Sequence, residues 1–122
     1  MIGLRDRALI AVMTFSYARI SAALGMNMGD YYQSTGRRMM MRLHEKGGRE
    51  HKVPAHHTVE EYLDAYIEAA GLVDGKDALF QTTRGQSRIL TGNRLTRRAA
   101  LFMIRRRCEV AGIQIKICNH TF

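Results

Sequence analysis

The beginning of the chain alternates apolar and polar residues with the period of an α-helix, which predicts a helix over residues 3–15. Its apolar residues recur three or four positions apart: Leu4, Ala8, Ala11, Val12 and Phe15. The charged residues 5–7 are expected to lie on the opposite side, facing solvent. A shorter helical pattern covers residues 20–26, with a glycine near its end. Between the two helices, a stretch of small and hydroxyl-bearing residues contains one arginine, Arg19.

Beyond these helices the pattern changes to the two-residue alternation that is typical of β-strands. Three strands are expected, over residues 31–33, 37–43 and 50–53, joined by two turns that contain glycine. Pro54 should end the third strand, because proline has no backbone N–H to donate to a neighbouring strand. We therefore predict one small three-stranded antiparallel sheet.

The second half of the chain begins with a strongly amphipathic segment, which predicts a helix over residues 59–70. A capping box that begins at Thr58 should start this helix, and Gly71 should end it. His56 and His57 precede it. Adjacent histidines do not face a common site, and no other metal ligand stands at a useful spacing. We therefore expect these two histidines to lie in a surface loop and to bind no metal.

The last predicted helix is about fifteen residues long and is capped by Thr96. Residues 78–80 are apolar and should be buried before it, whereas the polar residues 82–93 should form an exposed loop. Its core-facing residues are expected to be Ala100, Met103, Ile104, Cys108 and Ala111. Its outer faces carry Arg97, Arg98, Arg105 and Arg106.

Length and composition are those of one globular domain of 122 residues. No apolar run is long enough to span a membrane, and the N-terminus lacks the apolar core of a signal peptide, so we expect a cytoplasmic location. Nineteen basic and eleven acidic residues give a net charge of +8. This excess predicts a polyanionic partner, with nucleic acid favoured over an anionic membrane, although some proteins are basic without such a partner.

The basic residues near the last helix are the first candidates for phosphate contacts: Arg94, Arg97, Arg98, Arg105 and Arg106. A run of charge on a helix is usually a solvated face, but few acidic residues stand one turn away to neutralise this one. The chain has no Trp, four Phe and five Tyr, so contacts with the phosphate backbone are favoured over stacking on bases. Taken alone, Arg19 would be interpreted as a structural arginine at the end of a helix.

Three motifs stand in a particular order along the chain. They are Ala-Arg-Ile-Ser at residues 18–21, Leu-His-Glu-Lys-Gly-Gly-Arg-Glu-His-Lys-Val-Pro at residues 43–54, and His-Thr-Phe at residues 120–122. Shorter sequence motifs at residues 5–9, 28–30 and 111–113 accompany these three motifs. In this order and spacing, the chain resembles the catalytic domain of tyrosine recombinases, the phage integrase family. The resemblance implies an α+β fold, mainly helical with a small three-stranded antiparallel sheet, of which residues 1–122 would form one partial domain.

What the resemblance implies about chemistry is specific. Family members break and rejoin double-stranded DNA without a metal or other cofactor, through a tyrosine that forms a 3′-phosphotyrosyl intermediate. By resemblance, Arg19 is the first of two arginines that bind the phosphate, a task that suits a planar cation that never loses its charge. Lys46, at the tip of the hairpin, is expected to protonate the leaving 5′-oxygen. His120 is expected to hydrogen-bond the phosphate.

The chain also departs from the family pattern. Ala22 stands where the family usually carries an acidic residue. The given sequence ends at Phe122, before the positions at which the second arginine and the nucleophilic tyrosine would lie. Tyr17 and the four other tyrosines all precede the final motif and are interpreted as core or strand residues. We therefore expect this chain by itself to bind DNA without completing cleavage.

The expected parent is a site-specific recombinase or integrase of a bacterial or phage mobile element, which would work as a tetramer on DNA. One alternative is a non-catalytic DNA-binding or regulatory remnant of an integrase, in which Ala22 is a true loss. A basic module for RNA or a membrane surface is a third interpretation, but it rests on charge alone. The target sequence and the type of element are not readable from the residues.

Overall fold

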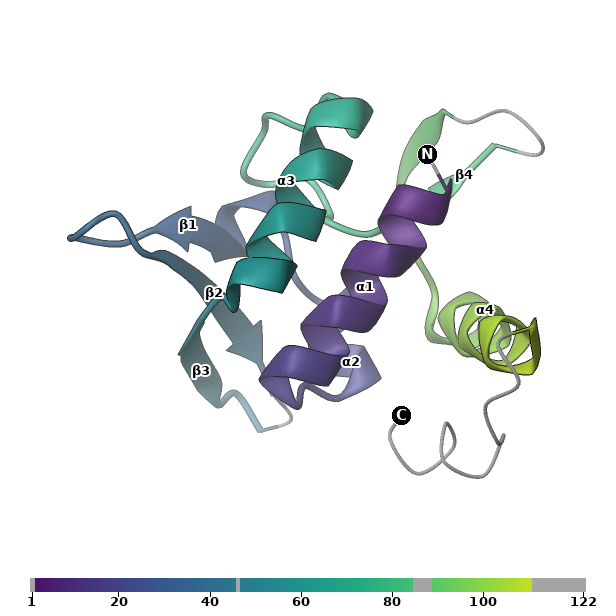
Figure 1. The fold of residues 1–122 in the computed structure, drawn as a ribbon, viewed down its shortest axis with the longest axis horizontal. Helices are drawn as coiled ribbons and strands as arrows, with labels where there is room; N and C mark the ends of the chain where they lie inside the picture. The colour runs from purple at the N-terminus through teal and green to yellow at the C-terminus, as the bar shows by residue number, and fades with distance from the viewer. Residues whose placement is uncertain (1, 46, 85–88, 111–122) are drawn as a thin grey trace.

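The structure is a computed structural model that describes residues 2–45, 47–84 and 89–110. In chain order the elements are α1 (Ile2–Ser16), α2 (Ile20–Leu24), the 3₁₀ helix η1 (Met28–Asp30), β1 (Tyr31–Gln33), β2 (Met39–His44), β3 (Glu50–Pro54), α3 (His57–Ala70), β4 (Gln81–Thr83), β5 (Leu90–Arg94) and α4 (Arg97–Val110). Helices dominate, and a small antiparallel sheet lies beside them (Figure 1). The predicted fold class is confirmed.

The helices α1 and α3 pack against each other and form the centre of the core (Figure 1). Completely buried side chains from both helices meet there: Ala8, Leu9, Val12, Val59, Leu63 and Tyr66. Burying one side chain of the size of leucine stabilises a fold by about 1.5–3 kcal/mol, so this face accounts for much of the stability. The expected solvent-facing position of residues 5–7 is wrong for Arg5 and Asp6, which are buried.

The sheet has the predicted antiparallel order β1-β2-β3. The register pairs Tyr31 with Met41, and Leu43 with His51. On β2, Met41 and Leu43 are buried, while the intervening Arg42 is only half-buried, as the two-residue alternation predicts. The strand begins at Met39 rather than at residue 37, because the turn before it is closed by a hydrogen bond from Ser34 N to Arg38 O of 2.8 Å.

The start of α3 differs from the prediction. The residue at the N-cap is His56 rather than Thr58, and its Nδ1 accepts a hydrogen bond of 3.1 Å from the backbone N–H of Thr58. The His56 ring also stacks on Phe15 at the end of α1, with 4.3 Å between the ring centroids. The helix ends as expected at Gly71, whose left-handed backbone (φ 68°) favours glycine.

The expected loop over residues 82–93 is wrong at both ends, which form strands, although Arg84, Ile89, Gly92 and Asn93 are exposed as expected. Its two ends form an antiparallel ribbon, in which β4 pairs with β5. Polar side chains hold this ribbon together: the hydroxyls of Thr82 and Thr91 are hydrogen-bonded, and the buried Gln81 accepts a bond of 3.0 Å from Gly92 N. Leu95 N then donates to Phe80 O at 2.9 Å. The prediction that residues 78–80 are buried is confirmed.

The last helix, α4, is capped by Thr96, whose Oγ1 accepts a hydrogen bond of 3.1 Å from Ala99 N, as predicted. Ala100, Ile104 and Cys108 are buried on its inner side, and the helix packs against α2. The predicted core position of Ala111 lies outside the described residues. Within the described part of the chain, no helix is long and apolar enough to cross a membrane.

Candidate functional site

Arg19 lies at the N-cap of α2, the residue at which the chain turns from α1 into the next helix. Its backbone is extended (φ −70°, ψ 153°), and its carbonyl accepts the first hydrogen bond of the helix, 3.0 Å from Ala23 N. Its neighbours Ala18 and Ile20 are buried, whereas Arg19 itself is exposed. The backbone is thus anchored by buried residues on both sides, and the charged side chain is directed outward.

Among the described residues, the guanidinium of Arg19 has neither a hydrogen-bond acceptor nor a carboxylate partner. All its N–H groups are therefore available to an external anion, which a guanidinium can bind through two parallel hydrogen bonds. Ala22, one turn further along α2, is 4% exposed and faces the core. A carboxylate at this position of α2 would be almost buried, whereas alanine leaves no charge there.

The other end of α2 is held by Arg94, the last residue of β5. Its Nη1 donates to the carbonyl of Leu24 at 2.7 Å and to that of Met26 at 3.0 Å, and its Nη2 donates to Asn27 Oδ1. Sequence reasoning placed Arg94 among the phosphate-contacting residues. In the structure, its guanidinium faces protein acceptors.

The hairpin between β2 and β3 is where the sequence places Lys46, but Lys46 lies outside the described residues. The residues around it form a closed turn, with a hydrogen bond of 2.7 Å from Glu45 N to Arg49 O. Gly47 and Gly48 both have left-handed backbones, with φ of 86° and 77°. His120 also lies outside the described residues, so the structure does not place the three expected catalytic residues relative to one another.

A buried carboxylate, which sequence reasoning missed, fixes the base of this hairpin. Asp30 Oδ2 accepts from Asn27 N at 2.9 Å, and its Oδ1 lies 3.5 Å from Arg42 Nη1 and 3.3 Å from His44 Nε2. These contacts join β2 to η1, and η1 follows α2 in the chain. A carboxylate three residues after Asn27 is the only sequence signal that would have pointed to this arrangement.

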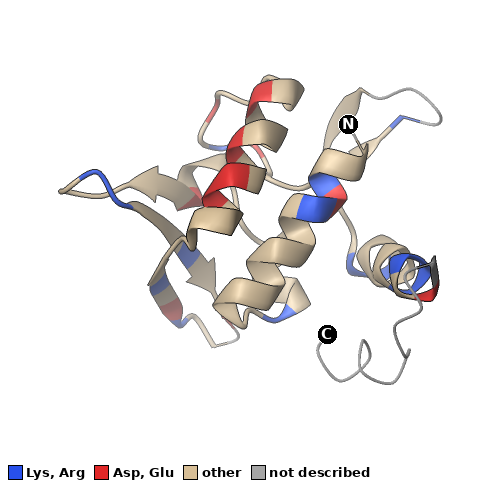
Figure 2. Ribbon diagram, viewed as in Figure 1, with Lys and Arg blue, Asp and Glu red and all other residues tan. Residues whose placement is uncertain are grey.

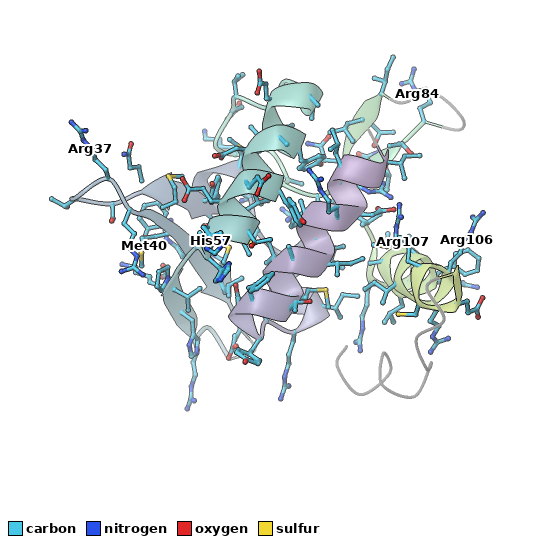
Figure 3. The ribbon with its side chains drawn as sticks, in the orientation of Figure 1. Arg37, Met40, His57, Arg84, Arg106 and Arg107 are labelled. Carbon is cyan, nitrogen blue, oxygen red and sulfur yellow. The ribbon has the colours of Figure 1, made fainter. Side chains whose placement is uncertain are left out.

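The four candidate arginines on α4 are exposed as expected: Arg97, Arg98, Arg105 and Arg106. Arg106 extends from the outer side of the helix (Figure 3). Because α4 packs against α2, the structure brings this basic face and the helix that carries Arg19 into one part of the molecule. Acidic residues are instead concentrated along α3 (Figure 2).

Arg107 differs from its neighbours, because it is bound to Asp6 of α1. Its Nε and Nη2 donate to Asp6 Oδ2 at 3.1 and 2.7 Å, while Arg5 donates to Oδ1 of the same carboxylate at 2.9 and 2.8 Å. Arg5 also donates to Gln81 O at 3.0 Å. The Asp6 carboxylate, only 2% exposed, thus joins α4 to α1, and Arg5 extends the network to β4.

Sequence reasoning missed this network, although the signal was present. Asp6 stands three and seven positions before Leu9 and Met13, on the core-facing side of α1. A charged residue on an apolar stripe is rarely buried without a partner. The role of the network is to fix α4 against α1.

Tyr31 and Tyr66 are buried, and the hydroxyl of each is already hydrogen-bonded within the protein. Burial raises the pKa of Tyr66 to about 12, and its hydroxyl donates to Leu79 O at 2.7 Å. Burial, together with a hydrogen bond to Asp64, raises the pKa of Tyr31 far above its ordinary value. The interpretation of all tyrosines as core or strand residues is wrong for Tyr17, which is 93% exposed in the loop before Arg19.

The described residues contain no group of three or more His, Cys, Asp or Glu side chains that could hold a metal ion. In the part of the chain that the structure describes, the outward guanidinium of Arg19 and the basic face of α4 are groups suited to binding an anion.

The comparisons with known proteins give one consistent result. The model of the phage integrase family matches residues 1–122. The chain is 32% identical over 120 residues to the tyrosine recombinase XerD of Mycobacterium tuberculosis, which covers 96% of this chain and 36% of that protein. It is 30% identical over 124 residues to XerD of Pseudomonas aeruginosa, covering 98% of this chain and 38% of that protein. The chain thus spans little more than a third of the length of these relatives.

Among solved structures, the fold matches the XerH site-specific recombinase bound to difH substrate in a pre-cleavage complex, with a TM-score of 0.69. The match covers 91% of this chain and 30% of that one, at 22% identity, so it supports the fold alone. Since the family model covers the whole given sequence, this chain belongs to the phage integrase family.

Proposed function

We propose that this chain is part of the catalytic domain of a site-specific tyrosine recombinase and that it binds duplex DNA through its phosphates. Membership of the family, the identity to XerD proteins and the likeness to XerH support the proposal. The net charge of +8 and the exposed arginines of α4 agree with a polyanionic partner. The parent protein would act on DNA inside a bacterial or phage-infected cell, as a tetramer.

The observation that carries the proposal is the state of Arg19. Its guanidinium is exposed and has no partner among the described residues, while its backbone is fixed as the N-cap of α2. Because the backbone of Arg19 is already fixed, only the rotamers of its side chain have to be ordered when it binds an anion. Such a group suits a phosphate whose negative charge increases during the reaction.

The proposed roles follow the family chemistry. Arg19 would bind the non-bridging oxygens of the scissile phosphate. Lys46 would donate a proton to the leaving 5′-oxygen, and the left-handed glycines beside it leave the tip of the hairpin free of side chains that would block this approach. His120 would hydrogen-bond the same phosphate. The basic face of α4 would contact the DNA backbone on either side of it.

The first experiment measures DNA affinity of the chain as a function of salt. We expect the dissociation constant for a labelled duplex to rise by at least about tenfold between roughly 50 and 200 mM salt, as two or more phosphate contacts require. The double variant Arg97→Gln with Arg98→Gln removes two arginines of α4 and should lower the salt dependence of binding. The control, Arg37→Gln with Arg38→Gln at the turn between β1 and β2, should lower it less. No binding at low salt would refute the proposal.

The second experiment tests the reaction. It uses a longer protein that contains this chain together with the positions expected for the second arginine and the nucleophilic tyrosine. A suicide DNA substrate, in which the cleaved strand cannot be rejoined, should trap a covalent protein–DNA adduct. The burial of Ala22 where the family usually has an acidic residue favours a second candidate, a non-catalytic DNA-binding remnant. DNA binding without an adduct would support that candidate and contradict the recombinase assignment.

A further inference from the structure

We propose that Arg94 is a positioning residue, which fixes α2 so that Arg19 is held in the orientation that binds phosphate. The inference rests on the proposed function of Arg19 and gives Arg94 a role that requires no contact with DNA. Arg94 is thus interpreted as a residue that supports α2, and not as one of the basic residues that contact phosphate.

The contacts of Arg94 all go to one short segment. The arginine donates to the carbonyls of Leu24 and Met26 and to the side chain of Asn27, at the end of α2 and just after it. Both Nη atoms are directed at the protein. Three of the five N–H groups of the guanidinium are thus committed to protein acceptors, including both on Nη1, so the Nη1–Nη2 edge cannot bind a phosphate through two parallel donors.

The acceptors that Arg94 satisfies are ones that α2 cannot satisfy itself. The last carbonyls of a helix have no partner within the helix, and they carry the negative end of its dipole. Leu24 is the last residue of α2, so its carbonyl is such a group. Met26 O also accepts from Leu79 N at 3.0 Å, which places two donors on this carbonyl.

Arg94 is itself held on a fixed frame. Its backbone pairs with that of Gln81 in the ribbon, and the next residue, Leu95, is buried and donates to Phe80 O. Gln81 in turn accepts from Arg5 of the buried network. The guanidinium therefore connects α2 to the β4–β5 ribbon, which Arg5 joins to the buried Asp6.

The connection reaches Arg19 because α2 is so short. Its five residues span about 7.5 Å at the usual rise per residue, with Arg19 at one end and the Arg94 contacts at the other. The backbone N–H of Ala23 donates to the carbonyl of Arg19, and Ala23 is directly followed by Leu24, whose carbonyl Arg94 binds. One helical hydrogen bond therefore links the Arg19 end of α2 to the Arg94 end. A tilt at the Arg94 end would change the direction of the Arg19 side chain.

A double-mutant cycle on duplex binding tests the proposal. Arg19→Met and Arg94→Met should each weaken binding about tenfold and lower the salt slope by about 0.9, the loss of one phosphate contact. The double variant should be no weaker than Arg19→Met, because Arg94 acts through Arg19. Lys76→Met is the matched control: it removes one exposed positive charge whose side chain makes no hydrogen bond or ion pair among the described residues, although its loop adjoins Met28 and Gly29, and it should change neither quantity appreciably. Additive losses, with a slope lowered by about 1.8 in the double variant, would overturn the proposal.

Two further measurements keep the test decisive. Arg94→Lys retains the charge but loses the fork, so we expect it to bind as weakly as Arg94→Met; near-normal binding by this variant would mean a direct phosphate contact. Without DNA, amide hydrogen exchange of Ala23 should be faster in Arg94→Met than in Lys76→Met, at equal thermal stability of the remaining core. If Arg19→Met binds normally, the role of Arg19 fails, and the exchange rate of Ala23 alone decides whether Arg94 fixes α2.

Discussion

Tyr17 has a left-handed backbone (φ 54°), a conformation in which a residue other than glycine is strained. Its ring is 93% exposed, so packing of the side chain does not offset this strain. The loop between α1 and α2 is therefore held in place by its buried neighbours rather than by Tyr17 itself.

We predict that Tyr17→Gly raises the free energy of unfolding by about 0.5–1 kcal/mol, since the relief of strain exceeds the extra entropy of the unfolded chain. Thermal unfolding followed by circular dichroism would measure the gain. Tyr17→Ala is the control, because it removes the same ring but keeps the strained conformation, and it should bring no gain. Equal stability of the glycine and alanine variants would contradict this explanation.

Tyr66 should make the stability of the protein depend on alkaline pH. Its pKa is raised by burial to about 12 in the folded state against about 10 when unfolded, so the folded state holds its proton to higher pH. This contribution is fully present below pH 10 and is lost as the pH rises through 12, and it amounts to roughly 2–3 kcal/mol. In urea unfolding at several pH values, Tyr66→Phe should be less stable than the native chain near pH 7 but lose less stability above pH 10. Parallel pH profiles would contradict the assignment.

For single residues, the sequence predicted where a side chain lies in the fold better than it predicted its hydrogen-bond partners. It placed Arg19 at a helix junction, and the exposed side chain agrees with the role inferred from the family. It could not predict that Arg94 is bound to α2, because the acceptors lie about seventy residues earlier in the chain. Long-range hydrogen bonds to backbone carbonyls leave no pattern in the sequence.

Among the elements, α1 and α4 are joined by the carboxylate of Asp6. We predict that Asp6→Asn lowers the free energy of unfolding by about 3–5 kcal/mol, because it leaves the buried Arg5 without a counter-charge. Arg107→Met should cost about 1 kcal/mol or less, since the side chain of Arg107 is 47% exposed. Urea unfolding would measure both values. Glu61→Gln, at an exposed position of α3, is the control and should change stability by less than about 0.5 kcal/mol. An effect of Asp6→Asn as small as that of the control would contradict the role of the network.

The helices and the three-stranded sheet were predictable because their periodicity is local. The two-residue alternation on β2 and the glycines of the hairpin fix the strand pairing without information from elsewhere in the chain. The ribbon of β4 and β5 was missed because its residues are polar, and it is held by threonine and glutamine side chains rather than by apolar alternation. The cap of α3 was missed because a histidine ring accepts the bond that serine or threonine usually accepts.

For the whole molecule, the distribution of charge separates two surfaces. Acidic residues follow α3, whereas arginines cover the outer side of α4, which packs against α2 (Figure 2). The net charge of the sequence predicted a polyanionic partner, but the surface on which the partner lies depends on the packing of α2 against α4, which only the fold determines. Under the proposed function, DNA would lie across α2 and α4, away from α3.

The most direct test of the whole account is the contribution of Arg19 to duplex binding. The chain with Arg19→Met should bind a labelled duplex about tenfold or more weakly than the native chain at low salt, because a charge-assisted contact with phosphate is lost. Its fold should remain intact, since the native guanidinium has no partner among the described residues to lose. Lys76→Met, with the same net charge, should bind like the native chain. Equal affinities of the Arg19→Met and Lys76→Met variants would mean that Arg19 does not contact DNA, and would contradict the account.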